Sequence, residues 1–99
     1  MIILTGSVIA KPEKRAEVLR LSLEHVQRSR AEPGCIRHNV SVDCENDLRF
    51  VFVEYWQDMP ALMQHFALAA SKNFVAELST CVSAEPEMHI FDAAEVQPG

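Results

Sequence analysis

His65 is the side chain whose type and position most directly indicate acid–base chemistry. It lies nine residues after Trp56, and helical steps place it beside the apolar positions Leu62 and Phe66. An imidazole has an ordinary pKa of about 6.5, which suits proton transfer near neutral pH. This position can place His65 at the rim of a cavity between a helix and a sheet, where it could transfer a proton. The residues alone favour the other interpretation, a structural histidine that caps a backbone group.

Phe52, Glu54 and Trp56 alternate along a strongly apolar segment and therefore share one face of a predicted strand. Trp56 could form the wall of a pocket for an aromatic ligand, or it packs in the core. A carboxylate on an apolar strand face needs a partner, because an unpaired buried charge is costly. Arg30 and Arg37 are the candidate partners of Glu54, and a structural ion pair is favoured over a catalytic base.

His38 and Asn39 are neighbours on another predicted strand, so they point to opposite faces of the sheet and at most one lines a given cavity. Asn39 could orient a phenolate oxygen, or it forms a local hydrogen bond. His38 shares a cavity with Glu54 only if the hairpin register pairs their faces. The sequence leaves that register open.

The spacing of the histidines argues against a metal site. His25, His38, His65 and His89 form no H-x-H or H-x-x-x-H pattern, and no two cysteines have ligand spacing. The chain also lacks a glycine-rich phosphate loop and a G-x-S-x-G nucleophile motif. We therefore expect no metal, no dinucleotide and no other cofactor.

The elements that position these residues follow the order strand, helix, strand, strand, helix, strand. Apolar and β-branched residues predict strands over 2–10, 35–43, 48–56 and 87–92. Helices are predicted from Pro12 to about Arg30, after the N-cap Asp58, and over about 71–82. This order is typical of a ferredoxin-like α+β fold with a four-stranded antiparallel sheet. We expect one domain over residues 1–99, with 93–99 as a C-terminal arm.

Apolar residues at helical spacing predict the buried face of each helix. The predicted stripes are Ala16, Leu19, Leu23 and Val26 in the first helix, Met59, Leu62, Met63 and Phe66 in the second, and Phe74, Val75, Leu78 and Cys81 in the third. His25, together with Ser22 and Ser29, is then expected on the flank of the first helix.

The segment 48–56 is apolar on both of its faces, because Val51, Val53 and Tyr55 alternate with the face that carries Trp56. Right-handed crossovers would place both helical regions on one face of the sheet. The other face would then be an exposed apolar patch, which soluble monomers avoid. We therefore expect a homodimer that packs sheet to sheet.

Composition argues against several classes of function. The chain has 99 residues, of which 48% are hydrophobic and 23% charged, as in globular domains. A net charge of −5 with nine Lys and Arg argues against binding to nucleic acid or to an anionic membrane. The odd number of cysteines and the lack of a recognisable targeting segment indicate reduced thiols and a cytoplasmic protein.

Three segments carry a pattern that can be compared with known families: residues 29–37 (SRAEPGCIR), 50–56 (FVFVEYW) and 61–66 (ALMQHF). Together they resemble the antibiotic biosynthesis monooxygenase family, and the resemblance extends over most of residues 2–78. It implies a dimeric α+β barrel that oxidises phenols, quinols or anthrones with dioxygen, often without metal or flavin. Two positions differ from the family pattern, because His38 stands in place of a tyrosine and Ala70 in place of a second histidine.

The resemblance implies a cofactor-independent monooxygenase acting on a small aromatic phenol, quinol or anthrone. In this hypothesis His65 transfers the proton, Trp56 forms the wall, and Asn39 or Arg37 orients the substrate oxygen. The other residues expected at the substrate are Glu54, His38, Phe52, Phe66 and Arg30.

Two alternatives remain open at this point. One is an isomerase for a small phosphorylated or polar carbonyl compound, which would need cations such as Arg30, Arg37 and Lys72 in the pocket. The other is a dimer that binds an aromatic metabolite without turnover, an alternative that the differences at His38 and Ala70 keep open.

Overall fold

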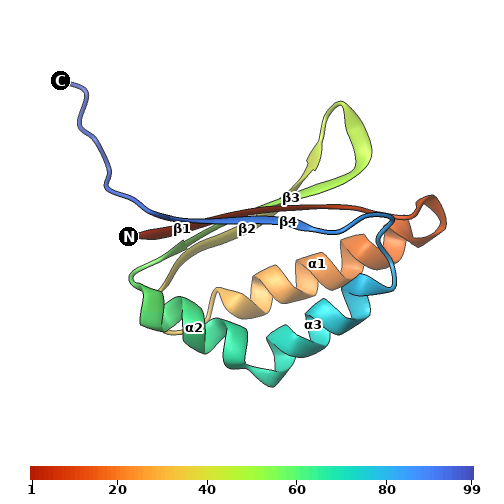
Figure 1. The fold of residues 1–99 in the computed structure, drawn as a ribbon, viewed down its shortest axis with the longest axis horizontal. Helices are drawn as coiled ribbons and strands as arrows, with labels where there is room; N and C mark the ends of the chain where they lie inside the picture. Colours follow the sequence, from red (N-terminus) through yellow and green to blue (C-terminus); the bar gives the residue numbers. More distant parts are fainter.

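The computed structural model describes residues 1–99 and consists of a four-stranded antiparallel sheet with three α-helices (Figure 1). The strands are β1 (Ile2–Ile9), β2 (Cys35–Asp43), β3 (Asn46–Trp56) and β4 (Glu87–Asp92). The helices are α1 (Arg15–Ser29), which follows a 3₁₀ turn over Pro12–Lys14, then α2 (Met59–Ala67) and α3 (Ala69–Ser79). The predicted ferredoxin-like α+β fold is confirmed.

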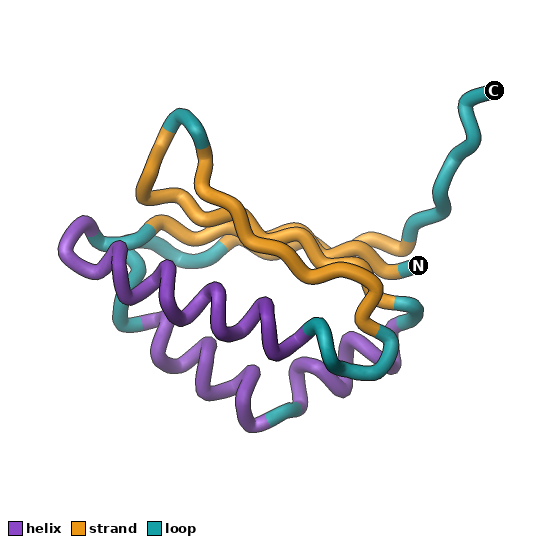
Figure 2. Tube along the Cα trace, turned by 180° about the vertical axis from the view of Figure 1, so that it is seen from behind, coloured by secondary structure: helices purple, strands orange, loops and turns teal.

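The strands lie in the order β2-β3-β1-β4, so the apolar strands β1 and β3 occupy the centre of the sheet. All three helices lie against one face of the sheet, as the views from the two sides show (Figures 1 and 2). No other element of the chain lies on the opposite face. We call these the covered face and the bare face.

The register of the β2–β3 hairpin settles which residues share the covered face. His38 lies opposite Glu54, and Asn39 lies opposite Val53. Opposed residues in an antiparallel pair point to the same side of the sheet. His38 and Glu54 therefore both point toward the helices, where they are 0% and 6% exposed.

The buried face of α1 differs from the prediction. Leu23, which was expected in the core, is 41% exposed. The residues that are buried are Val18, Leu21, Ser22, His25, Val26 and Ser29. Ser29 can occupy this face because its hydroxyl donates to the His25 carbonyl oxygen at 2.6 Å. Because His25 is among these buried residues, the prediction that it lies on the flank of the helix is wrong.

The other two helices also bury fewer apolar residues than predicted. Asp58 caps α2 as expected, because its carboxylate accepts a hydrogen bond from the Ala61 amide at 3.0 Å. Met63 and Val75 were expected in the core but are 54% and 63% exposed. The buried residues are instead Ala61, Leu62 and His65 in α2, and Ser71 and Leu78 in α3.

Gly34 allows the turn after α1 to lie against α2. Its φ is +81°, a left-handed conformation that side chains disfavour. A Cβ at this position would lie 2.6 Å from the Cβ of Ala61. The absence of a side chain therefore brings the turn that carries Glu32 close to the helix that carries His65.

The core under the helices consists of two apolar clusters. One includes Phe50 and Phe52, and the other includes Trp56 and Leu62. Glu54 lies between Phe52 and Trp56 on the same face of β3. A layer of polar side chains therefore separates the two clusters, and the candidate site lies in this layer.

The C-terminal residues after β4 have no regular secondary structure. The Ala93 amide donates to the Met1 carbonyl oxygen at 2.8 Å, and beyond it the chain extends away from the sheet (Figure 1). All three cysteines are free thiols. None of the helices has the length and apolar character needed to cross a membrane.

Candidate active site

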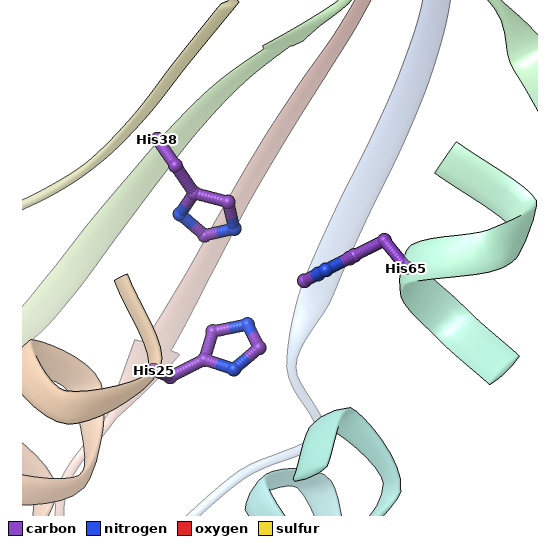
Figure 3. A group of neighbouring side chains, drawn as sticks. All are labelled: His25, His38 and His65. Carbon is purple, nitrogen blue, oxygen red and sulfur yellow. The ribbon is translucent and has the colours of Figure 1, made fainter. Parts of the chain in front are cut away.

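Three histidines from three different elements meet beneath the covered face. His25 comes from α1, His38 from β2 and His65 from α2, and their rings gather around one point (Figure 3). One ring nitrogen of each lies within 4.8 Å of the others. All three side chains are buried. We call this group the histidine trio.

Glu54 lies beside the histidine trio and is held by Trp56. The indole Nε1 of Trp56 donates to Glu54 Oε1 at 2.9 Å. The same oxygen lies 3.3 Å from Nε2 of His38 and 4.0 Å from Nε2 of His65. No arginine pairs with Glu54, so the predicted ion pair with Arg30 or Arg37 is wrong. A neutral indole donor and neighbouring imidazoles surround this carboxylate instead.

His65 is oriented by a carboxylate from the turn after α1. Its Nδ1 lies 2.7 Å from Glu32 Oε1. Because a carboxylate accepts hydrogen bonds, Nδ1 carries the proton, and the lone pair of the neutral ring is on Nε2. Ser71 Oγ lies 3.5 Å from the same Nδ1, and the Trp56 ring lies against the imidazole with centroids 4.7 Å apart. His65 therefore has a fixed orientation and a free basic nitrogen.

His25 is a neutral imidazole at ordinary pH. Burial is the largest cause that lowers its pKa to about 3, and charge repulsion from the neighbouring His38, His65 and Arg28 contributes to the same shift. The ring stacks on Phe74 with centroids 4.0 Å apart and planes 5° apart. Arg28 Nη2 lies 3.2 Å from His25 Nδ1, and a guanidinium can only donate. In this arrangement Nδ1 accepts and Nε2 carries the proton.

A cavity of about 520 Å³ opens beside the histidine trio, between the sheet and α3. His25, Glu54 and His65 contribute its polar wall. The rest of the lining is mostly apolar and includes Leu4, Val8, Phe52, Phe66, Phe74, Val75, Leu78 and Met88. Gly6 also lines the cavity, where a Cβ would lie 3.2 Å from the Glu87 carbonyl oxygen. The cavity can therefore hold a small, largely apolar molecule against an imidazole and a carboxylate.

The structure brings six of the nine predicted site residues together. Four of them line the cavity: Phe52, Glu54, His65 and Phe66. The other two contact residues of its polar wall, since Trp56 donates to Glu54 and the His38 ring lies against the His65 ring. The remaining three predicted residues have exposed or half-buried side chains and lie outside the cavity lining: Arg30, Arg37 and Asn39.

Arg37 and Asn39 belong to the bare face. Their strand partners are Tyr55 and Val53, and the Arg37 guanidinium lies 5.3 Å from the centre of the Tyr55 ring. Arg30 lies at the edge of β2, where its Nε donates to the His38 carbonyl oxygen at 3.0 Å and its Nη2 to Asn39 Oδ1 at 3.1 Å. None of the three reaches the cavity of its own chain.

Sequence reasoning missed His25, Glu32 and Phe74. A signal for His25 was present, because Val18, Leu21 and Ser22 lie on one helical stripe with it. The stripe can be recognised in the sequence only if serine and histidine are counted as possible buried residues along with the apolar ones. Glu32 lies 33 residues from His65, so only the tertiary structure brings this pair together.

The cysteine nearest to the site is not an activated nucleophile. Burial raises the pKa of the Cys35 thiol, and the neighbouring carboxylates Glu32 and Glu54 raise it further. The thiol is therefore protonated at neutral pH, whereas a thiolate is needed for nucleophilic attack. The reactive groups of the site are imidazoles and carboxylates.

The fold and the site define a ferredoxin-like α+β protein with a histidine–carboxylate group beside an apolar cavity. The model of the family described as antibiotic biosynthesis monooxygenase matches residues 1–77. This chain belongs to that family.

The chain is also similar to individual proteins and solved structures. A proposed antibiotic biosynthesis monooxygenase of Deinococcus radiodurans is 26% identical, with a TM-score of 0.93 over 98% of this chain and 96% of its own. A conserved protein of Methanosarcina mazei is 30% identical, with a TM-score of 0.87 over 91% of this chain and 89% of its own. An uncharacterized protein of Synechocystis is 33% identical over 97% of this chain, and the chain spans 65% of its length.

Proposed function

We propose that this protein is a monooxygenase that uses dioxygen to oxidise a small aromatic phenol, quinol or anthrone. The observation that carries the proposal is the Glu32–His65 pair, with 2.7 Å between Oε1 and Nδ1, at the wall of an apolar cavity. Membership of the antibiotic biosynthesis monooxygenase family supports the same class of reaction.

His65 is the proton acceptor in this proposal. With Nδ1–H held by Glu32, the Nε2 lone pair can take the acidic proton of the substrate. The Glu32 carboxylate then stabilises the imidazolium that forms. Glu32 acts through His65 and is a positioning residue.

The cavity supports an aromatic substrate. Its volume of about 520 Å³ lies within the range of roughly 300–1,000 Å³ found for small-molecule pockets. Phe52, Phe66 and Phe74 provide ring faces and edges for an aromatic ligand. A mostly apolar lining also excludes water, which favours reaction of the substrate anion with dioxygen over reprotonation.

The substrate supplies the electrons in this reaction. For an anthrone, His65 removes a proton from the ring methylene, and the resulting carbanion adds to dioxygen. The peroxide takes up the proton from the imidazolium, and the hydroperoxide then loses water to leave a new carbonyl group. One oxygen atom enters the quinone product and the other leaves as water, so atoms and electrons balance without an added reductant.

Oxygen uptake tests the proposal. Chelator-treated protein is mixed with an anthrone or a reduced naphthoquinol in an oxygen electrode, with heat-inactivated protein as the blank for autoxidation. We expect uptake well above the blank, with quinone formed in equal amount from the anthrone. Uptake equal to the blank, with saturable binding of the same compounds, would favour the role of a binding protein.

The isomerase alternative finds less support in the geometry. It would need cations in the cavity, and Arg30, Arg37 and Lys72 were its candidates. None of these three lines the cavity.

We also propose that two copies of the chain pair through their bare faces. This face carries Ile3, Val51, Val53, Tyr55 and Phe91 with no helix above it. Phe91 is 52% exposed in the single chain. Contiguous apolar residues on an uncovered sheet favour association with a second copy.

A further inference from the structure

We propose that the histidine trio binds one divalent transition-metal ion of the zinc, nickel and copper class. The three imidazoles come from α1, β2 and α2, so they form a cluster that their spacing in the sequence did not indicate (Figure 3). Neutral imidazole nitrogens are preferred ligands of these ions. The inference rests on the geometry of the trio and does not depend on the proposed oxygenation.

His38 provides the observation that points most directly to a ligand. Its side chain is 0% exposed, and neither Nδ1 nor Nε2 has a hydrogen-bond partner. Nε2 lies 3.3 Å from Glu54 Oε1, but the orientation of the two groups does not make a hydrogen bond. A buried polar group without a partner loses its hydration without a compensating interaction, which destabilises the folded state. A metal ion bound to His38 would supply the missing partner.

The carboxylates around the trio fit a dication. Glu32 holds the Nδ1 of His65 at 2.7 Å, an arrangement that commonly orients histidine ligands of metals through the carboxylate on the far ring nitrogen. Glu54 Oε1 lies near the other ring nitrogen of His65, 4.0 Å from Nε2. Two carboxylates beside three neutral imidazoles can neutralise the charge of a dication.

Binding requires two local adjustments. The ring nitrogens now lie within 4.8 Å of one another, whereas metal–nitrogen bonds of about 2.0–2.1 Å in a tetrahedral site place them about 3.3 Å apart. Small rotations of the three side chains can close this gap. His25 must also move its proton from Nε2 to Nδ1, which requires the exposed Arg28 to turn away.

A bound ion would occupy the Nε2 lone pair of His65, which the proposed proton transfer uses. Metal binding and metal-free turnover are therefore alternative states of one site. For this reason the test measures binding and not activity, and failure of either proposal leaves the other standing.

Calorimetric titration of chelator-treated protein with Zn²⁺ tests the inference. We expect one ion per chain, with affinity at least tenfold lower in His38→Gln and in His65→Gln. His89 on β4 lies on the bare face, on the opposite side of the sheet from the trio, so His89→Gln is the control and should bind within twofold of the unchanged protein. No saturable binding, or binding that His38→Gln and His65→Gln leave intact, would overturn the proposal.

A second measurement does not depend on the folding of variants. Nitrogen NMR of histidine-labelled protein follows all four imidazoles during addition of Zn²⁺. We expect the ring nitrogens of His25, His38 and His65 to shift together at one equivalent while those of His89 remain unchanged. A shift of His89 alone, or no shift at one equivalent, would contradict the assignment.

Discussion

The two faces of the sheet differ in what they bury and in what they can do. On the covered face, Glu54 and His38 lie in a polar layer between two apolar clusters, next to a cavity. On the bare face, Val53 and Tyr55 lie beside other apolar residues with no helix above them. This difference is the reason we propose chemistry on the covered face, where polar groups are held inside a core, and association through the bare face, where apolar residues are uncovered.

Trp56 on the covered face should give the largest effect on stability. Its side chain is 0% exposed and it donates the hydrogen bond that holds Glu54. We expect Trp56→Ala to lower the free energy of unfolding by about 3–5 kcal/mol. Urea unfolding measures this loss, and Leu23→Ala, at an exposed position of α1, is the control with an expected loss below about 1 kcal/mol. Equal losses in both variants would contradict the burial of Trp56.

Acid should weaken the covered face through His25. Its pKa is about 3 in the folded protein, against 6.5 ordinarily, because burial and the neighbouring His38, His65 and Arg28 disfavour the charged ring. Between about pH 3 and pH 6.5, the His25 imidazole is therefore protonated in the unfolded chain and neutral in the folded chain. This group should lower the free energy of unfolding by up to about 1.4 kcal/mol per pH unit as pH falls from about 6.5 toward 3.

Urea unfolding of metal-free protein between pH 7 and pH 4 measures this slope. His25→Leu should remove the part of the slope that His25 contributes, whereas His89→Leu on β4 should keep it. The same slope in all three proteins would show that His25 is not the responsible group.

A charge on the bare face should separate the proposed dimer. Val53→Glu would place a carboxylate in the apolar patch, and burial of an unpaired charge is costly. We expect at least tenfold weaker self-association, measured by sedimentation equilibrium. Met63→Glu, at an exposed position of α2 outside the cavity lining, is the control and should associate like the unchanged protein. A monomeric unchanged protein at high concentration would remove the role assigned to this face.

Loss of the α2 cap should give the smallest effect. Asp58 accepts one hydrogen bond, from the Ala61 amide at 3.0 Å, at the start of the helix that carries His65. We expect Asp58→Ala to lower the free energy of unfolding by about 1 kcal/mol. Thermal unfolding detects this change. Asp58→Asn should restore most of the loss, and a full loss in Asp58→Asn would indicate that capping is not the cause.

Most of the fold could be predicted from the sequence because its signals are local. Alternation in β1 and β3, the Asp58 cap and the turn around Gly34 each act within a few residues. The ends of β2 and β4 agree with the predicted 35–43 and 87–92. Placement of the helices on one face followed from general rules of chain connection.

The candidate site could be predicted only in part because it depends on contacts across the chain. Glu54, Trp56 and His65 were recognisable by type and position. The hairpin register that places His38 opposite Glu54 could not be recognised from the sequence. A search for apolar stripes missed His25, because a buried imidazole and buried serines take the places of apolar residues on α1. Arg37 and Asn39 were selected for their chemistry, but strand alternation places them on the bare face.

Oxygen consumption by His65→Gln tests the central claim most directly. Metal-free unchanged protein, His65→Gln and His89→Gln are compared with the same anthrone, after circular dichroism confirms that all three are folded. Loss of a general base typically costs a factor of about 10²–10⁴, so we expect the rate above the blank to fall at least about 100-fold in His65→Gln. His89→Gln should stay within twofold of the unchanged protein. Equal rates in His65→Gln and the unchanged protein would contradict the role of His65 as proton acceptor.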